Sequence, residues 1–413
     1  MSDLLWPGGH RAGPAFSDGA LLAAMVEVEA AWLAALVTHS VAPATIDAAR
    51  SVRSQPVDAS EAARLAEAAE AAGNPVVAFV AWLRERVGER DPVSARWLHR
   101  GLTSQDVLDS ALMLLARQVV RDVREELVHQ VAVLGAMADR YRSTPMVGRT
   151  LTQPAVPMAF GVKAAAWLNG VLDAAEALDA LSFPAQFGGA AGNRSGITAL
   201  GGDPAGVAAS AAAALGLAER GPWHTARAPV TRLGDALVGC SAAWGRIAND
   251  VLTLSRPEIG ELNEPAAEGR GGSSAMPQKV NPVLSILVRR AALSAPAHGS
   301  LLHLAAADTG DERPAGAWHV EWEPLALLGR HTLSAARQTS ELLDGLVVHA
   351  ERMAATLDTH RRDVSAEYRL LAGLAGRPAE PGAAAAAPGG GADAALVAAA
   401  RDRARAWTDG GRP

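Results

Sequence analysis

The chain has 413 residues, of which 49% are hydrophobic and only 4% aromatic, and its formal net charge is −6. This length allows two or three domains with a large core, and the excess of Ala and Leu over β-branched and aromatic residues favours helices. The negative charge argues against sequence-independent nucleic-acid binding, so an anionic substrate would need a local positive pocket. With Cys240 as the single cysteine, an intrachain disulfide is excluded and a cysteine-based zinc site is disfavoured.

The first 100 residues predict short helices interrupted by proline and glycine, with one amphipathic helix between Leu21 and Leu36. The start of the chain lacks the basic and apolar regions of a signal peptide. No run of about 18 apolar residues predicts a membrane span. We therefore expect a cytoplasmic protein that binds neither membranes nor nucleic acid.

The central part of the chain predicts five long helices. Between Ser104 and Tyr141 there is no proline, and apolar residues recur at spacings of three and four, which indicates one helix of 38 residues, about 57 Å long. Four more are predicted at 154–181, 229–256, 283–306 and 321–349, and the stretch 182–228 is glycine-rich and less regular. Five long helices on one core predict an up-and-down bundle.

The expected fold is therefore all-α. It comprises an N-terminal helical domain at 1–100, a central five-helix domain at 101–349 and a small helical C-terminal region at 350–413. Within the last region, the Pro/Ala/Gly-rich residues 376–391 predict a mobile loop or linker.

Three of the predicted helices begin with polar residues, at Thr103–Asp106, Arg149–Pro154 and Asn281–Pro282. Each start fits N-capping, for which Thr, Ser and Asn are preferred and Pro suits the first turn. The alternative is that the free N–H groups bind carboxylates. If the first two helices are antiparallel neighbours, their starts lie roughly 40–57 Å apart. One substrate can then touch both only if another copy of the chain supplies one of them.

The segment 257–282 joins two predicted helices and ends in the run Gly271-Gly272-Ser273-Ser274-Ala275-Met276-Pro277-Gln278-Lys279-Val280-Asn281-Pro282. A long, glycine-rich loop in a compact domain is usually functional or disordered, and the polar residues at its end favour a mobile lid over a substrate. Lysine occurs only at 163 and 279, whereas Arg is used elsewhere. The compact ammonium of Lys279 differs chemically from a planar guanidinium, and Lys163 is expected to be an internal ion-pair partner.

Residues 272–282 match the signature of the fumarase/aspartase superfamily, Gly-Ser-Ser-x-Met-Pro-x-Lys-x-Asn-Pro, at every specified position. Two further segments of that superfamily, Gly101–Asp106 and Gly148–Gln153, precede it in the right order. The resemblance covers most of the chain. It implies a five-helix central domain and a homotetramer in which three subunits build each active site.

Within the superfamily, the chain most resembles the bacterial branch that acts on 3-carboxy-cis,cis-muconate. The segments that carry this resemblance are 103–109, 186–192, 222–225 and 315–322. The branch closes its substrate to 4-carboxymuconolactone by intramolecular carboxylate addition to a double bond, in the β-ketoadipate pathway of aromatic degradation. The alternatives are a fumarate-releasing lyase on adenylosuccinate, argininosuccinate or a related substituted succinate, and a catalytically silent helical oligomer.

One departure from the superfamily bears on the reaction. Many of its lyases place His where this chain has Leu151. A His there would protonate a poor leaving group such as an amine or hydroxide, whereas a carboxylate leaves as a stable anion. Leu151 therefore disfavours an amine-releasing lyase, unless His99 or His224 replaces the missing acid.

The resemblance implies that Ser273 transfers the proton. It also implies that the substrate, a small polycarboxylate, is bound by Thr103, Ser104, Thr150, Gln153, Lys279, Asn281 and Arg313. Weaker assignments fall on His99, Arg149, Ser274, Met276, His224 and His319, and plain capping, surface or structural roles stay open for individual residues. Neither lysine follows a glycine, and the histidines lack a zinc-type spacing, so no cofactor or metal is expected.

Overall fold

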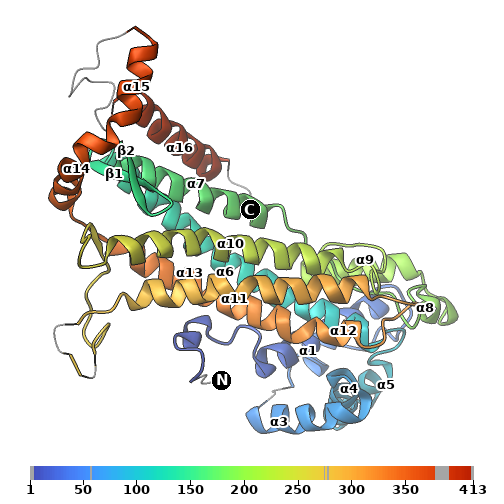
Figure 1. Ribbon diagram of the computed structural model, residues 1–413. Coiled ribbons are helices and arrows are strands. Elements are labelled where there is room, and N and C mark those ends of the chain that lie inside the picture. Colours follow the sequence, from blue (N-terminus) through green and yellow to red (C-terminus); the bar gives the residue numbers. More distant parts are fainter. Residues whose placement is uncertain (1–3, 56–57, 274, 277–278, 377–389, 411–413) are drawn as a thin grey trace. The chain divides into compact units, whose positions relative to one another are not determined.

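The computed structural model describes residues 4–55, 58–273, 275–276, 279–376 and 390–410. Helices dominate, which confirms the predicted fold class, and two short antiparallel strand pairs accompany them (Figure 1). The chain separates into two compact units. The first comprises 1–122, 181–235 and 296–331, and the second comprises 123–180, 236–295 and 332–413. The predicted domain boundaries at residues 100 and 349 follow from where the long helices begin and end in the sequence, and not from contacts, so they stay a prediction.

The long helices are α6 (Ser104–Arg140), α7 (Phe160–Asp179), α10 (Ala228–Leu254), α11 (Val283–Ala307) and α13 (Trp322–Asp344). They correspond to the five predicted helices. The predicted end of the last one at residue 349 is wrong, because α13 stops at Asp344 and residues 347–348 form a strand.

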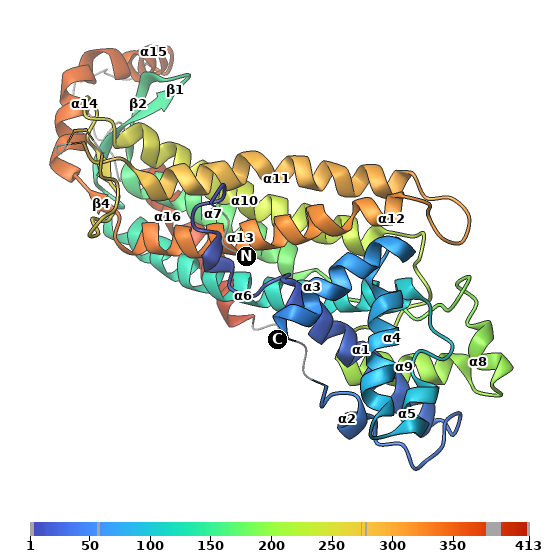
Figure 2. The same ribbon diagram turned by 90° about the horizontal axis from the view of Figure 1, so that it is seen from below.

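The first unit contains the predicted short N-terminal helices. These are η1 (Gly9–Ala12), α1 (Asp18–Thr38), α2 (Ala48–Ser51), α3 (Ala59–Ala68), η2 (Ala69–Ala72), α4 (Pro75–Gly88) and α5 (Pro92–Trp97), and α8 (Ser195–Ala199), α9 (Pro204–Leu215) and α12 (Ala317–Val320) follow. Side chains such as Ser17, Asn74 and Asp91 cap the starts of α1, α4 and α5. Helix α1 packs against α9, and α4 packs against α5 (Figure 2).

Helix α1 is not amphipathic as predicted, because it buries residues on nearly all sides, including Trp32 and Glu29. It is also long and apolar enough to cross a membrane, contrary to the prediction that no such segment exists. However, 67% of the apolar window is buried within the structure, and the core helix of a globular protein passes the same test. We therefore describe α1 as a core helix of the first unit.

The second unit contains a hairpin of β1 (Pro145–Thr150) and β2 (Gln153–Ala159), and α14 (Ala350–Val364) packs against both strands. Figure 1 shows α14 beside this hairpin and α16 (Gly391–Asp409) along α7. Helix α15 (Ala366–Leu374) follows α14, and β3 (Leu262–Asn263) pairs with β4 (Val347–Val348). Residues 377–389 of the predicted mobile loop lie outside the described residues.

The hairpin corrects the prediction of a helix from 154 to 181. Helix α7 begins only at Phe160, and the preceding residues form β2. Pro154 and Pro157 lack an N–H group and push the residues before them toward extended backbone, which suits a short strand. Thr150 and Gln153 therefore lie at a hairpin turn and not at a helix start.

Candidate active site

In the first unit, Gly101 to Thr103 lead into α6. Gly101 has a φ of 82°, and a Cβ atom there would lie 2.6 Å from the Ile197 side chain, so only glycine fits. The Thr103 hydroxyl accepts a hydrogen bond from the exposed guanidinium of Arg313, which also donates to the Ala190 carbonyl at 3.2 Å. The structure thus brings Thr103 and Arg313 into contact, and Thr103 and Ser104 are half-buried.

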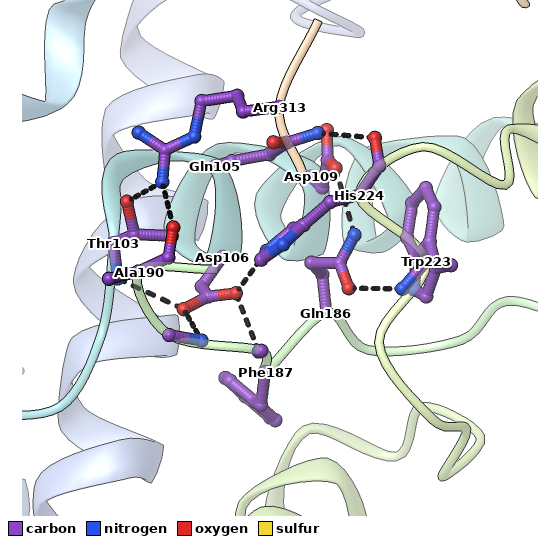
Figure 3. Close-up of polar contacts among 12 residues, drawn as sticks. Thr103, Gln105, Asp106, Asp109, Gln186, Phe187, Ala190, Trp223, His224 and Arg313 are labelled. Atoms are coloured by element: carbon purple, nitrogen blue, oxygen red, sulfur yellow. Dashed lines mark hydrogen bonds and ion pairs between the residues drawn. The ribbon is translucent and has the colours of Figure 1, made fainter. Parts of the chain in front are cut away.

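The Asp106 carboxylate organises this region. It is fully buried and accepts hydrogen bonds from the backbone N–H groups of Thr103 (2.9 Å), Gly188 (2.7 Å) and Gly189 (2.9 Å). His224 Nε2 lies 2.9 Å from the same carboxylate. Figure 3 shows the three chain segments converging on Asp106. Since buried donors need partners, this one side chain fixes the start of α6 and the glycine-rich segment together.

Sequence reasoning assigned no role to Asp106. Its place at the third position of the helix after Thr103 is the signal that could have indicated a cap.

The packing of His224 also explains the glycine at position 188. A Cβ atom there would lie 2.6 Å from His224 Cε1, so the imidazole packs directly on the backbone of residue 188.

The histidines proposed as site residues have different surroundings. His224 is 4% exposed, and its Nδ1 has no hydrogen-bond partner among the described residues. His99 Nδ1 lies 2.6 Å from the buried carboxylate of Glu29. His319 is exposed and its ring packs against Trp322, with the ring centroids 4.8 Å apart. The enclosed positions of His224 and His99 suit structural roles, and a catalytic part for any of them stays a prediction.

A buried ion-pair cluster surrounds Arg227, which sequence reasoning missed. Its guanidinium lies 2.7 Å from Asp109 and 2.6 Å from Glu321, and it packs over the Trp223 ring at 4.7 Å. Burial alone would lower the pKa of Arg227, but the charges of Asp109 and Glu321 raise it. Burial also raises the pKa of Glu321, against the effect of Arg227. All four segments that suggested the cycloisomerase branch thus contribute to a buried frame, since Gln186 Nε2 also donates to Asp109 at 3.3 Å.

In the second unit, the hairpin tip exposes Thr150, Leu151 and Gln153. Thr150 pairs with Gln153, so Leu151 and Thr152 form a two-residue turn, with φ angles of 49° and 73°. Leu151 is 95% exposed. The left-handed conformation costs a non-glycine residue about 1–2 kcal/mol, so a strained and exposed leucine stands at the tip. Such strain tends to occur at functional positions.

The signature segment, residues 271–282, also lies in the second unit. The Ser273 hydroxyl is half-buried and accepts hydrogen bonds from the N–H groups of Met276 at 3.2 Å and Ala275 at 3.5 Å. Met276 and Lys279 are exposed. The proposed site residue Ser274 falls outside the described residues, as do residues 277 and 278.

The Asn281 side chain does not cap α11, a role that the sequence left open beside the predicted substrate binding. Its backbone N–H and its side-chain amide both donate to the Gly271 carbonyl, at 2.8 and 3.1 Å. The Glu264 carboxylate instead accepts from the N–H groups of Leu284 (3.0 Å) and Ser285 (2.6 Å) at the start of α11. A carboxylate therefore does occupy this helix N-terminus, as anion binding predicts, but it belongs to the chain itself.

Two further cations in the second unit are paired. Arg149, a weaker candidate for substrate binding, makes two hydrogen bonds to Glu261, at 3.0 and 2.8 Å. Lys163 lies 3.3 Å from Asp250, as expected for an internal ion pair, and burial lowers its pKa. Asp250 also accepts a hydrogen bond from Trp167 Nε1 at 2.8 Å.

The candidate residues are divided between the units. Thr103, Ser104 and Arg313 belong to the first, whereas Thr150, Gln153, Ser273, Lys279 and Asn281 belong to the second. Within the described ranges, no three His, Cys, Asp or Glu side chains are grouped so that they could hold a metal ion.

Comparison with known proteins gives matches along most of the chain. A family model described as lyase matches residues 16–296. Nitrosuccinate lyase from Streptomyces davaonensis is 44% identical over 357 residues, which cover 83% of this chain and 74% of that protein. 3-Carboxy-cis,cis-muconate cycloisomerase from Pseudomonas aeruginosa is 38% identical over 367 residues, covering 86% and 78% respectively.

Among solved structures, 3-carboxy-cis,cis-muconate lactonizing enzyme from Pseudomonas putida superposes with a TM-score of 0.82 at 27% identity. The superposition covers 96% of this chain and 97% of that one. The shared architecture therefore extends beyond the residues that the family model matches.

Proposed function

The chain belongs to the fumarase/aspartase family of lyases, and we propose that it eliminates a stable anion from a small polycarboxylate, with nitrosuccinate as its substrate. A base removes a proton from the CH2 carbon, which lies between one carboxylate and the carbon that bears the nitro group. The C–H electrons form the double bond, and the C–N electrons leave with the nitro group as nitrite. The products are fumarate, nitrite and one proton, so atoms and charge balance without a cofactor. The 44% identity to a nitrosuccinate lyase supports this substrate.

Leu151 is the observation on which the leaving-group argument rests. It is 95% exposed at the hairpin tip, between two threonines and Gln153, so the tip offers hydroxyls and an amide but no acidic group. An amine or hydroxide would need a proton to leave. Nitrite, like a carboxylate, is the anion of an acid that is ionised at neutral pH, so it needs none.

We assign proton abstraction to Ser273. The two N–H groups that donate to its hydroxyl oxygen point at the atom that would carry negative charge after deprotonation. Serine is a weak base, and stabilisation of its oxyanion is the form of activation it needs. The carbanion formed next to a substrate carboxylate carries additional charge. We assign its stabilisation to Lys279 and Asn281, together with Thr103 and Arg313.

Lyases of this family act on small carboxylates and are typically oligomeric. Helix α6, which follows Thr103, is one unbroken helix of 37 residues, about 55 Å long, and the hairpin with Thr150 begins only after it ends. We therefore propose a homotetramer in which first-unit residues of one copy and second-unit residues of others meet at each site.

The second candidate is the cycloisomerase that closes 3-carboxy-cis,cis-muconate to 4-carboxymuconolactone in aromatic degradation. Its support is the 38% identity to the Pseudomonas aeruginosa enzyme and the TM-score of 0.82 to the Pseudomonas putida structure. Leu151 suits this reaction equally, because the group that adds or leaves is a carboxylate. Both candidate reactions thus require the protein to stabilise a carbanion next to a carboxylate, and they differ in the substrate.

The purified protein should be mixed with nitrosuccinate while fumarate absorbance and nitrite are followed. In parallel, 3-carboxy-cis,cis-muconate is followed by loss of its diene absorbance, with adenylosuccinate and argininosuccinate as amine-releasing controls. We expect stoichiometric nitrite and fumarate, and no turnover of the controls. Ser273→Ala should abolish turnover and leave the oligomer intact. Fast turnover of an amine-releasing control would refute the leaving-group argument. Loss of the diene absorbance of 3-carboxy-cis,cis-muconate, with no nitrite released from nitrosuccinate, would favour the cycloisomerase.

A further inference from the structure

We propose that Arg149 and Glu261 form a partly buried clamp that positions the hairpin tip and the signature segment for the reaction; the catalytic part of this inference rests on the proposed function. Arg149 lies in β1 directly before Thr150, and Glu261 lies directly before β3 in the segment that leads to Ser273. Arg149 Nη1 donates to Glu261 Oε2 at 3.0 Å, and Arg149 Nη2 donates to Glu261 Oε1 at 2.8 Å.

The carboxylate end of the clamp is held rigidly. Glu261 is fully buried, its N–H donates to the Leu254 carbonyl at 2.8 Å, and its carbonyl accepts from the His349 N–H at 3.0 Å. Glu261 is thereby tied to the end of α10 and to the residue before α14. The strand after it pairs with β4. A group bound to this carboxylate therefore takes its position from three elements of the second unit.

The guanidinium end carries the hairpin. The β1–β2 ladder shifts register between Gly148 and Arg149, so that Gly148 pairs with Val156 but Arg149 pairs with Pro154. Irregularities of this kind commonly redirect a side chain, and this one lies immediately before Arg149. The tip residues Thr150 to Gln153 follow at once, so a change in the direction of the Arg149 side chain would move them.

The geometry favours positioning over two other roles. The Nη1–Nη2 edge of the guanidinium already binds Glu261, so that edge does not bind a substrate carboxylate. A buried ion pair is also a weak source of stability, because desolvation offsets much of the attraction. What a two-point fork supplies is a fixed orientation. Catalysis is sensitive to that, since a misplacement of about 1 Å can cost roughly 100-fold in rate.

The first test compares two variants. Arg149→Lys keeps the positive charge and loses the fork, and we expect kcat for nitrosuccinate to fall at least tenfold with a smaller change in KM. The double variant Arg149→Met/Glu261→Leu replaces the pair by apolar side chains of similar size, which often preserves stability. We expect its thermal midpoint to stay near that of the wild type and its kcat to stay low. Recovery of kcat together with stability would show that the pair is only structural and would overturn the proposal.

A matched control is the pair of Arg124 and Asp179, which lies in the same unit at 2.7 Å and is also partly buried. Neither residue belongs to the hairpin or to the signature segment. Arg124→Lys should therefore leave kcat at the wild-type value. A loss of kcat as large as that of Arg149→Lys would show that the effect is not specific to the pair of Arg149 and Glu261, and would contradict the clamp.

Hydrogen–deuterium exchange tests the clamp without any substrate. In Arg149→Lys we expect faster exchange in peptides covering 145–159 and 262–273 and unchanged exchange in α16. Unchanged exchange in both of the first two peptides would overturn the clamp. If the wild-type protein does not turn over nitrosuccinate, the proposed function fails, and this measurement still decides whether the two segments are coupled.

Discussion

His224 Nε2 and Asp106 Oδ1 lie 2.9 Å apart in the interior of the first unit, although 118 positions separate the two residues in the chain. The same carboxylate receives three backbone N–H groups, including that of Thr103. The candidate substrate-binding residue Thr103 is thus placed by a side chain that never needs to touch substrate. Replacement of Asp106 should consequently lower the folding stability of the protein.

Asp106→Asn should lower the free energy of unfolding by about 2–4 kcal/mol, because an amide nitrogen would face buried donors and leave them unpaired. Urea denaturation measures the effect. Asp235→Asn is the control, since Asp235 forms an exposed pair with His303, and its cost should stay below about 1 kcal/mol. Equal costs for the two variants would contradict the role given to Asp106.

Leu151→Asn should stabilise the protein by about 0.5–1 kcal/mol, because asparagine tolerates the left-handed conformation better than leucine does. Leu200 offers the matched control, as it is also exposed but has a φ of −84°. Leu200→Asn should give no comparable gain. The two thermal midpoints test the prediction, and an identical response at both positions would mean that the turn carries no strain.

Lys163 should make stability increase with pH in the alkaline range. Burial lowers the pKa of Lys163 in the folded protein from its ordinary value of 10.5, so the unfolded chain binds the proton more tightly. Between the folded pKa and 10.5, deprotonation therefore favours the folded state, and below the folded pKa the full penalty of burying the charge remains. Lys163→Met should weaken the rise of the unfolding free energy with pH. An unchanged pH profile in that variant would refute the assignment.

Glu264→Gln should lower stability by about 0.5–1 kcal/mol, because it removes the negative charge at the N-terminus of α11. The loss should shrink at high salt, where charge–dipole interactions are screened. Denaturation at two ionic strengths measures this. A loss independent of salt would indicate that hydrogen bonding alone, which the amide oxygen retains in part, accounts for the cap.

Much of the helical architecture follows from sequence periodicity. The boundaries predicted for α10 and α11 lie within two residues of those observed, because long apolar repeats between glycine and proline signals define them. The hairpin was missed because Pro154 reads equally well as the first residue of a helix, and only the pairing of Thr150 with Gln153 distinguishes the two. Local sequence does not encode that pairing strongly.

The site was predictable only where it is local. The signature segment identifies the family by itself, and Ser273 follows from it as a candidate. In contrast, His224, which contacts Asp106, and Glu261, which pairs with Arg149, lie 118 and 112 positions from those residues, so no spacing rule connects them. Glu264 was missed for a similar reason, since it caps a helix that begins 19 positions later at Val283.

The bonds from Asn281 to the Gly271 carbonyl bring the two ends of the signature segment together at its base. A loop closed in this way has already lost most of the entropy that its length can cost, and doubling the length adds only about 0.6 kcal/mol. New residues grafted beside the exposed Val280 would therefore extend a tethered ring without moving its anchor points. The segment that contains the candidate residue Ser273 should therefore accept insertions at Val280 while its two ends stay fixed.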